Sequence, residues 1–304
     1  MGAGHDHGER NMSDGRLVGA VVVNLLLTVA QIVGGAVSGS LALIADALHN
    51  LNDAASLGLA LFARRVGRRP ADKLMTFGYG RAEIVAALIN LTTLVIVGLY
   101  LLVEAINRFL DPQPVGGWIV VIVAGIALVI DIITALLVYA GSKHSLNIKA
   151  AFLHNVSDAL ASVGVIIAGT LILLYDLYIA DLVMTVLIAS YVLYQGFSLL
   201  PQTIKLLMGA VPDDVEFDAI VKALRETDGV KDLHHVHIWS LDEHERALEA
   251  HLVPAVSSLE AFEQVKADAR GMLRQRFSIG HATLEACLDE QGGDHAAAPH
   301  SHPK

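Results

Sequence analysis

Long apolar stretches fill the first part of the chain, and short polar connections separate them. Each stretch is long enough for an α-helix of about 20 residues to cross the hydrocarbon core of a bilayer. Ser38-Gly39-Ser40 alone separates the first two stretches and predicts a tight reversal. The six predicted membrane spans are 17–38, 41–63, 84–106, 116–140, 150–174 and 178–199.

The pattern changes after Gly209, where the elements are shorter and charged residues are common. Two segments repeat apolar residues at helical spacing, and three alternate as strands do. Asp213 and Asp214 suit the start of the first helix, and Ser257 or Ser258 can cap the second. The order α-β-β-α-β predicts a small, ferredoxin-like α+β domain with its helices on one face of the sheet. The predicted elements are helix 213–227, strands 230–241 and 246–253, helix 258–277 and strand 281–288.

These patterns divide the chain into four parts. A polar tail (1–16) precedes the six-helix transmembrane domain (17–208), and a soluble domain (209–290) precedes a second polar tail (291–304), which we expect to lack a fixed structure. Both tails carry histidines that either capture metal loosely or stay inert. They are His5, His7, His295, His300 and His302.

Positive charge gathers on one side of the predicted spans, which sets their orientation by the positive-inside rule. The opposite side has Arg108 as its one cation near a span end. We therefore expect both termini in the cytoplasm. Short loops and the absence of a cleavable leader favour a bacterial inner membrane. The cytoplasmic cations are Arg10, Arg16, Arg64, Arg65, Arg68, Arg69, Lys73, Arg81, Lys143 and Lys149.

Composition agrees with a membrane protein and excludes other classes. The chain is 54% hydrophobic and 17% charged, against about 25% charged residues in a typical globular protein. Its net charge of −10 and the lack of a basic stripe argue against nucleic acid as a partner. A single cysteine, Cys287, excludes an intramolecular disulfide framework.

Two predicted spans each contain a histidine followed four residues later by an aspartate: His49 with Asp53, and His154 with Asp158. Four residues turn an α-helix by about 400° and advance it by about 6 Å, so each pair shares one face. Ionisable groups in a membrane helix cost roughly 2.5–3.5 kcal/mol each, so a compensating partner is expected. Two imidazoles and two carboxylates facing one another make a four-coordinate site suited to Zn²⁺. A hydrogen-bonded cluster that only joins helices is the weaker alternative, because two carboxylates would be poorly neutralised.

Two further acids within predicted spans, Asp46 and Asp131, have candidate roles. Asp46, three residues before His49, either orients an imidazole as a hydrogen-bond acceptor or faces a water-filled vestibule. Asp131 either helps a proton or ion path or pairs with Asn24 or Gln31 of the first span.

Several motifs together resemble the cation diffusion facilitators, which export divalent transition metals by proton antiport. The resemblance runs from about residue 30 to residue 290. It is carried by GSLALIADALHNLND, RPADKLMTFGYGRAE, LNIKAAFLHNVSDALASVGV, GAVPDD and GVKDLHHVHIW.

The resemblance implies a transport site, a dimer and a regulatory domain. The transport site would be His49, Asp53, His154 and Asp158, in a homodimer embedded in the lipid bilayer. The cytoplasmic domain would bind metal and tune activity through His234, His251 and Glu285, although these are equally placed as ordinary surface residues of strands. His235, His237 and His281 are further candidates near that site. Arg81 and Asp213 would form a charge interlock between the two membrane halves.

The sequence departs from some members of the family in two connections. Where those members have an extra site built from an aspartate and two histidines, this chain has Asp72 but Met75 and Tyr79, so we expect no metal there. The connection between the fourth and fifth spans offers His144 alone, in place of a histidine-rich loop.

The chemistry predicted is exchange of Zn²⁺ for H⁺, with Co²⁺, Ni²⁺ or Cd²⁺ as alternative cargoes. Neutral imidazole binds Zn²⁺ and protonated imidazole does not, and the ordinary pKa of imidazole is about 6.5. Alternating access would carry the site from one side to the other. An intramembrane zinc protease is excluded because neither His49 nor His154 has an adjacent glutamate base. The protein is thus predicted to be no enzyme; a passive channel and a metal sensor stay open as alternatives.

Overall fold

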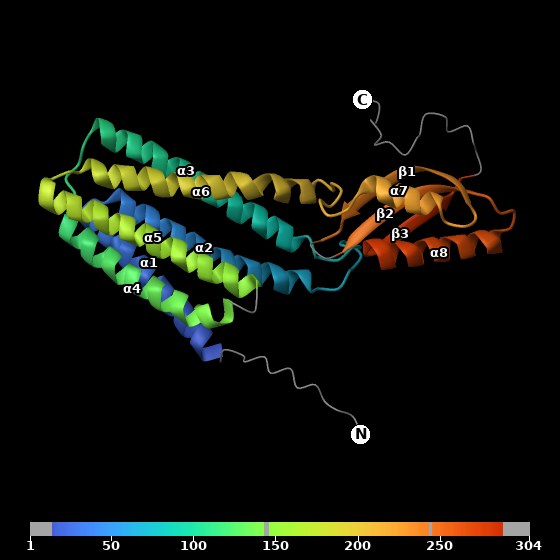
Figure 1. The fold of residues 1–304 in the computed structure, drawn as a ribbon, viewed down its shortest axis with the longest axis horizontal. Helices are drawn as coiled ribbons and strands as arrows, with labels where there is room; N and C mark the ends of the chain where they lie inside the picture. The colour runs from blue at the N-terminus through green and yellow to red at the C-terminus, as the bar shows by residue number, and fades with distance from the viewer. Residues whose placement is uncertain (1–13, 143–145, 243–244, 288–304) are drawn as a thin grey trace, which may run out of the picture. The chain divides into compact units, whose positions relative to one another are not determined.

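The computed structural model describes residues 14–142, 146–242 and 245–287 (Figure 1). The predicted histidine sites of the two tails and His144 lie outside these residues. The chain forms two compact units, one made of the residues up to Gly58 with Asn90–Ser198, the other of Leu59–Ile89 with the residues from Leu199 onward.

Six long helices occupy the positions of the six predicted spans. They are α1 (Asp14–Ser38), α2 (Leu41–Gly67), α3 (Ala82–Leu110), α4 (Gly117–Ser142), α5 (Leu146–Tyr175) and α6 (Ile179–Leu207). Over the described residues, length and apolarity alone make Ala82–Leu110, Gly117–Leu136, Phe152–Tyr175 and Ile179–Leu207 long enough to cross a membrane, whereas the apolar part of α1 is shorter (Val23–Ser38). Helix α2 is long enough but does not meet this criterion of apolarity. We attribute this to its polar residues, among them Asp46, His49 and Asp53.

Small residues allow the helices of the membrane unit to approach one another closely. Such residues are common between membrane helices, because the hydrophobic effect does not drive helices together within a bilayer. Gly98 of α3 lies against Leu193 of α6, and Gly196 of α6 lies against Val95 of α3. Apolar side chains from α2 to α6 fill the core, including Leu43, Leu101, Val120, Val165 and Val192. Many other large apolar side chains point outward, as a lipid-facing surface requires.

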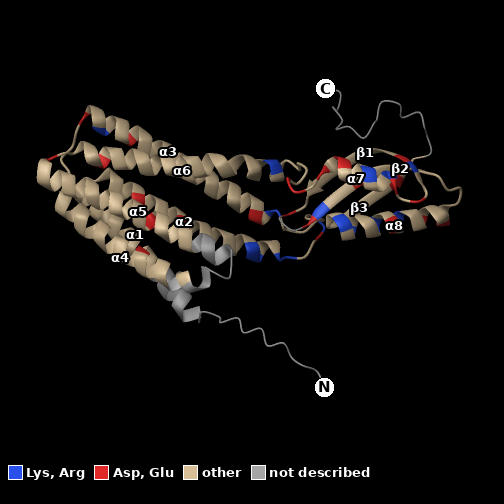
Figure 2. Ribbon diagram, in the orientation of Figure 1, with Lys and Arg blue, Asp and Glu red and all other residues tan. Residues whose placement is uncertain are grey.

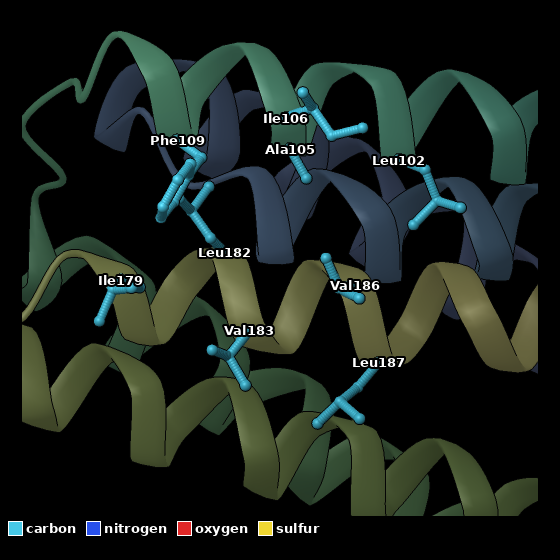
Figure 3. Close-up of a pocket in the computed structure, with 9 residues that line it drawn as sticks. All are labelled: Leu102, Ala105, Ile106, Phe109, Ile179, Leu182, Val183, Val186 and Leu187. Atoms are coloured by element: carbon cyan, nitrogen blue, oxygen red, sulfur yellow. The ribbon is translucent and has the colours of Figure 1, made fainter.

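Near the end of α3 and the start of α6, these two helices leave an open pocket of about 560 Å³ (Figure 3). All of its lining side chains are hydrocarbon, so the pocket offers no ligand to a cation. They are Leu102, Ala105, Ile106, Phe109, Ile179, Leu182, Val183, Val186 and Leu187.

The soluble part confirms the predicted α-β-β-α-β order. It consists of α7 (Phe217–Arg225), β1 (Val230–Ser240), β2 (Arg246–Pro254), α8 (Leu259–Phe277) and β3 (Ile279–Ala286). The sheet order is β1-β2-β3, with β1 antiparallel and β3 parallel to β2. Both helices pack on this sheet and touch each other, so they share one face.

The ends of the two soluble-domain helices test the capping predictions. Ser258 precedes α8, and its hydroxyl oxygen accepts a hydrogen bond from the Ala261 amide at 3.1 Å, as predicted. Helix α7 begins later than predicted, after Glu216, because Asp213 and Asp214 are engaged elsewhere. Asp214 pairs with Arg246, and Asp213 lies 3.9 Å from Lys205.

Candidate metal centre

Helices α2 and α5 present the two His/Asp pairs to one another. Because each pair is separated by one helical turn, the four side chains come from two facing stripes. His154 Nε2 lies 3.3 Å from Asp53 Oδ2 and 3.4 Å from Asp158 Oδ2. His49 Nε2 lies 3.6 Å from Asp53 Oδ2 and 3.7 Å from Asp158 Oδ1.

These separations suit a shared cation. A tetrahedron with bonds of about 2.0–2.1 Å has edges of about 3.3 Å. One ligand atom each from His49, Asp53 and Asp158 lies within 4.8 Å of the other two. His154 contacts both carboxylates from a more exposed position, with its ring 6.2 Å from that of His49. The structure therefore brings three of the four predicted ligands into one group and places the fourth at its rim.

The burial of side chains in this group costs free energy if no cation is bound between them. His49 is 6% exposed and Asp158 is 7% exposed. Among the described residues, both ring nitrogens of His49 and Asp53 Oδ2 are buried with no hydrogen-bond partner. Buried polar atoms in proteins are nearly always satisfied, so two unsatisfied atoms that face each other, His49 Nε2 and Asp53 Oδ2, call for a ligand. Imidazole nitrogen and carboxylate oxygen are donors that Zn²⁺ accepts.

Asp46 and Asp131, the two acids for which the sequence suggests candidate roles, have partners outside this group. Asp46 accepts a hydrogen bond of 2.6 Å from Gln31 of α1, and Gln31 accepts one of 3.1 Å from Asn50. Asp131 accepts a hydrogen bond of 3.1 Å from Ser162 of α5. Of the sequence alternatives, the pairing of Asp131 with Asn24 or Gln31 is not observed among the described contacts. Gln31 instead ties α1 to α2 beside the candidate site.

Asp181 at the start of α6 is a residue that the sequence analysis missed. It is 1% exposed, and its carboxylate accepts hydrogen bonds from Ser40 Oγ (2.5 Å), the Leu41 amide (2.7 Å) and the Ala42 amide (3.3 Å). It thus caps the N-terminus of α2, the helix that carries His49 and Asp53. In sequence, an acid in the first turn of α6 indicates only a favourable interaction with its own helix dipole.

In the other unit, Asp72 is committed to a turn. Its carboxylate accepts hydrogen bonds from the Leu74 and Met75 amides, both at 2.8 Å, and from the Tyr79 hydroxyl at 2.7 Å. The bond from the Met75 amide, then those from Tyr79 and Leu74, lower the pKa of Asp72. The bond to Asp72 also raises the pKa of Tyr79. These contacts support the expectation that this connection holds no metal.

The two residues of the expected charge interlock have other partners within the chain. Arg81 Nε donates to the Leu241 carbonyl oxygen at 3.3 Å, and Asp213 lies near Lys205. The interlock stays a prediction about two chains.

The soluble domain places His234, His251 and Glu285 side by side across the sheet. His234 pairs with His251 in the β1–β2 register, and His251 pairs with Glu285 in the β2–β3 register. His251 Nε2 lies 3.5 Å from Glu285 Oε2, and the rings of His234 and His251 are 5.5 Å apart. The ring of His235, the next residue of β1, stacks on the ring of His251 with 4.6 Å between their centroids.

A bulge in β1 brings two neighbouring histidines of this strand to His251. The β1–β2 register shifts between His234 and His237, and His235 has a positive φ of 52°. Neighbouring residues of β1 can therefore both face His251, which regular alternation forbids. His281 pairs with Ala247 instead and has a ring contact with Phe77.

The fold and the site together define a class: a multi-pass helical membrane protein with a buried cluster of cation ligands and a soluble α+β domain. Comparison with known proteins identifies the family within this class. Residues 17–208 match the model of the cation efflux transmembrane domain, and residues 212–286 match that of the cation efflux protein cytoplasmic domain.

Similar proteins include metal transporters from several bacteria. The metal cation efflux system protein CzcD of Cupriavidus metallidurans is 37% identical over 94% of this chain and 90% of its own length. The cadmium, cobalt and zinc/H(+)-K(+) antiporter of Bacillus subtilis is 34% identical over 82% of this chain and 81% of its own length. The zinc transporter ZitB of Escherichia coli K12 is 32% identical over 94% of this chain and 92% of its own length. A solved structure of the metal-bound C-terminal domain of CzcD is 31% identical, with a TM-score of 0.23 over 24% of this chain and all of that one.

The chain belongs to the cation efflux family, the cation diffusion facilitators. It is a membrane metal transporter and not an enzyme, as the sequence predicted.

Proposed function

We propose that the protein exports Zn²⁺ from the cytoplasm in exchange for H⁺, with His49, Asp53, His154 and Asp158 as the transport site. One observation carries the proposal: His49 and Asp53 of α2 hold buried donor atoms without hydrogen-bond partners, and Asp158 of α5 places a carboxylate oxygen within 4.8 Å of them. The relatives' names add that zinc, cadmium and cobalt are transported within the family. The imidazole pair favours Zn²⁺ over Mn²⁺, which prefers oxygen ligands throughout.

Proton exchange follows from the chemistry of these ligands. An imidazole that gains a proton loses the lone pair that binds the metal, so protonation and metal release are coupled. Two carboxylates balance the charge of the dication and can receive protons when it leaves. His154 is half exposed, whereas His49 is buried. This difference supports a path in which the ion leaves or arrives past His154, while alternating access exposes it on either side.

The proposal includes assembly and orientation. We infer a homodimer joined partly through the cytoplasmic domains, which the name of the family model matched by residues 212–286 supports. Arg81 and Asp213 would face each other across that dimer. The distribution of Lys and Arg supports termini on the cytoplasmic side of a bacterial inner membrane.

The cytoplasmic domain would sense metal through His234, His251 and Glu285. Their cross-strand placement supports this, and His235 is within reach of the same point. A bound ion would bring the two protomers together and favour transport. In the full-length dimer, His251→Ala should lower the number of Zn²⁺ ions bound per chain by one while leaving transport-site binding intact. Unchanged stoichiometry would remove this site from the proposal.

Uptake into proteoliposomes tests the transport site. Asp158→Ala should abolish Zn²⁺ flux driven by an imposed pH gradient while the dimer stays folded. Asp111→Ala, which changes an exposed acid in the α3–α4 connection, is the matched control and should transport normally. Flux that persists in Asp158→Ala would make the α5 pair structural. Flux that ignores the pH gradient would indicate a passive channel.

A further inference from the structure

The connection between α2 and α3 concentrates positive charge at the edge of a membrane span. Helix α3 is long and apolar enough to cross a bilayer, so the residues just before it lie at the membrane surface. Between residues 64 and 81 there are six cationic side chains and one acidic side chain, Asp72, although the whole chain has a net charge of −10. All six cations are exposed, and none forms an ion pair within the described part of the chain. They are Arg64, Arg65, Arg68, Arg69, Lys73 and Arg81. Figure 2 shows Lys and Arg residues in blue at the end of α2.

The same connection holds apolar side chains outward. Leu74 is 89% exposed and Phe77 is 66% exposed. Their exposure is built into the turn, because the Asp72 carboxylate accepts two backbone amides and the Tyr79 hydroxyl. The Gly78 amide closes the turn onto the Met75 carbonyl oxygen at 2.9 Å, with a φ of 80° that suits glycine.

An apolar groove runs beside this turn. It has a volume of about 590 Å³ and is lined by the end of α2, the turn, the start of α3 and the end of β1. Phe62 and Val85 contribute apolar walls, Trp239 lies at the β1 side, and Arg81 brings a cation to the rim. Hydrocarbon walls beside unneutralised cations match the two parts of an anionic lipid.

We propose that the α2–α3 connection binds an anionic phospholipid, whose acyl chain occupies the groove and whose headgroup meets the exposed arginines. The charge of residues 64–73 favours this occupant over a second copy of the chain, because their five cations would meet the same five cations across a twofold contact. Position selects it over a soluble partner, because Leu74 and Phe77 lie next to a membrane span. Each Lys or Arg beside a membrane span strengthens binding to anionic lipid by about 1 kcal/mol, which is about a fivefold gain in affinity per charge.

The chain supplies a fluorescent reporter for this site. It has two tryptophans, and Trp118→Phe leaves Trp239 in the groove as the single one. The full-length Trp118→Phe protein is reconstituted in phosphatidylcholine vesicles that contain acyl-brominated phosphatidylglycerol or, in parallel, the same mole fraction of acyl-brominated phosphatidylcholine. Bromine quenches tryptophan at short range, so quenching reports an acyl chain in the groove.

Brominated phosphatidylglycerol should quench Trp239 at several-fold lower mole fraction than brominated phosphatidylcholine. Arg65→Gln with Arg68→Gln should weaken that preference by about fivefold for each charge removed. Leu74→Ser with Phe77→Ser should reduce quenching by both lipids. Leu259→Ser, which changes a side chain that is 75% exposed in the soluble domain, is the matched control and should change nothing.

Three results would overturn the proposal. Equal quenching by the two brominated lipids would remove the anionic preference, and arginine variants that behave like Leu259→Ser would remove its cause. Turn variants that reduce dimer cross-linking but leave quenching unchanged would assign the surface to a second copy. The arginine pair is exposed and does not depend on the turn, so it decides the outcome even if the apolar variants fold poorly.

Discussion

Replacing Asp181 by alanine should destabilise the membrane unit by removing the cap of α2. Three donors lose their acceptor: Ser40 Oγ and the amides of Leu41 and Ala42. Ser40, Leu41 and Ala42 are at most 2% exposed, so water cannot replace the carboxylate without rearrangement.

The size of the effect can be bounded. Interhelical hydrogen bonds in membranes are worth about 0.6 kcal/mol each on average, which gives a lower limit of about 2 kcal/mol for the three. A buried donor left without an acceptor costs about 1–3 kcal/mol, and the Ser40 hydroxyl can rotate to another oxygen. We therefore expect Asp181→Ala to lower the free energy of unfolding by about 2–5 kcal/mol. Asp181→Asn keeps one acceptor oxygen and should lose less than the alanine variant.

Unfolding in detergent micelles titrated with sodium dodecyl sulfate measures this difference, with Asp111→Ala as the exposed-acid control. Zinc uptake provides the second readout, because the capped end of α2 lies about two turns before His49. Asp181→Ala should lose uptake in parallel with stability. If it unfolds like Asp111→Ala, the hydrogen bonds to α2 do not hold the helix and the reasoning fails.

Three further predictions, one of them with a control variant, concern other parts of the structure. His49→Asp replaces an imidazole by a hard oxygen donor and should broaden uptake toward Mn²⁺ and Cd²⁺ in proteoliposomes; unaltered selectivity would count against the imidazole argument. Gly196→Ala adds a Cβ only 2.6 Å from a valine of α3 and should cost about 1–3 kcal/mol of unfolding free energy, whereas Gly125→Ala meets no atom within 4 Å and should be neutral or stabilising. Tyr79→Phe removes one bond to Asp72 and should raise its lowered pKa toward the ordinary 3.8, as a carboxyl titration by NMR would show. Because the pKa of Asp72 is lowered in the folded chain, its hydrogen bonds stabilise the turn fully at pH values above the ordinary pKa of 3.8. This stabilisation is lost as the pH falls through the lowered pKa.

Sequence patterns predicted the parts of the fold that rest on local periodicity. Apolar length predicted the six long helices, and the serine before a charged helical segment predicted the Ser258 cap. The spacing of histidine and aspartate predicted which residues share a face, because helical geometry alone decides that. The meeting of α2 with α5 was inferred from the cost of ionisable groups in a membrane and from the family resemblance, since spacing within one helix says nothing about its neighbour.

Contacts between distant residues escaped the sequence analysis. Asp181 lies 141 positions from Ser40, and only the fold brings them together. His235 reaches His251 through a bulge, which shifts the parity on which strand reasoning depends. The later start of α7 has a similar cause, because Asp214 pairs with Arg246 of β2 instead of opening the helix.

Anomalous scattering at the zinc edge from crystals of the full-length protein grown with Zn²⁺ tests the central claim most directly. The account predicts a peak within the helices, about 2.0–2.2 Å from donor atoms of His49, Asp53 and Asp158, with His154 completing the shell. A zinc peak in the cytoplasmic domain with none between α2 and α5, at a concentration that supports transport, would contradict it.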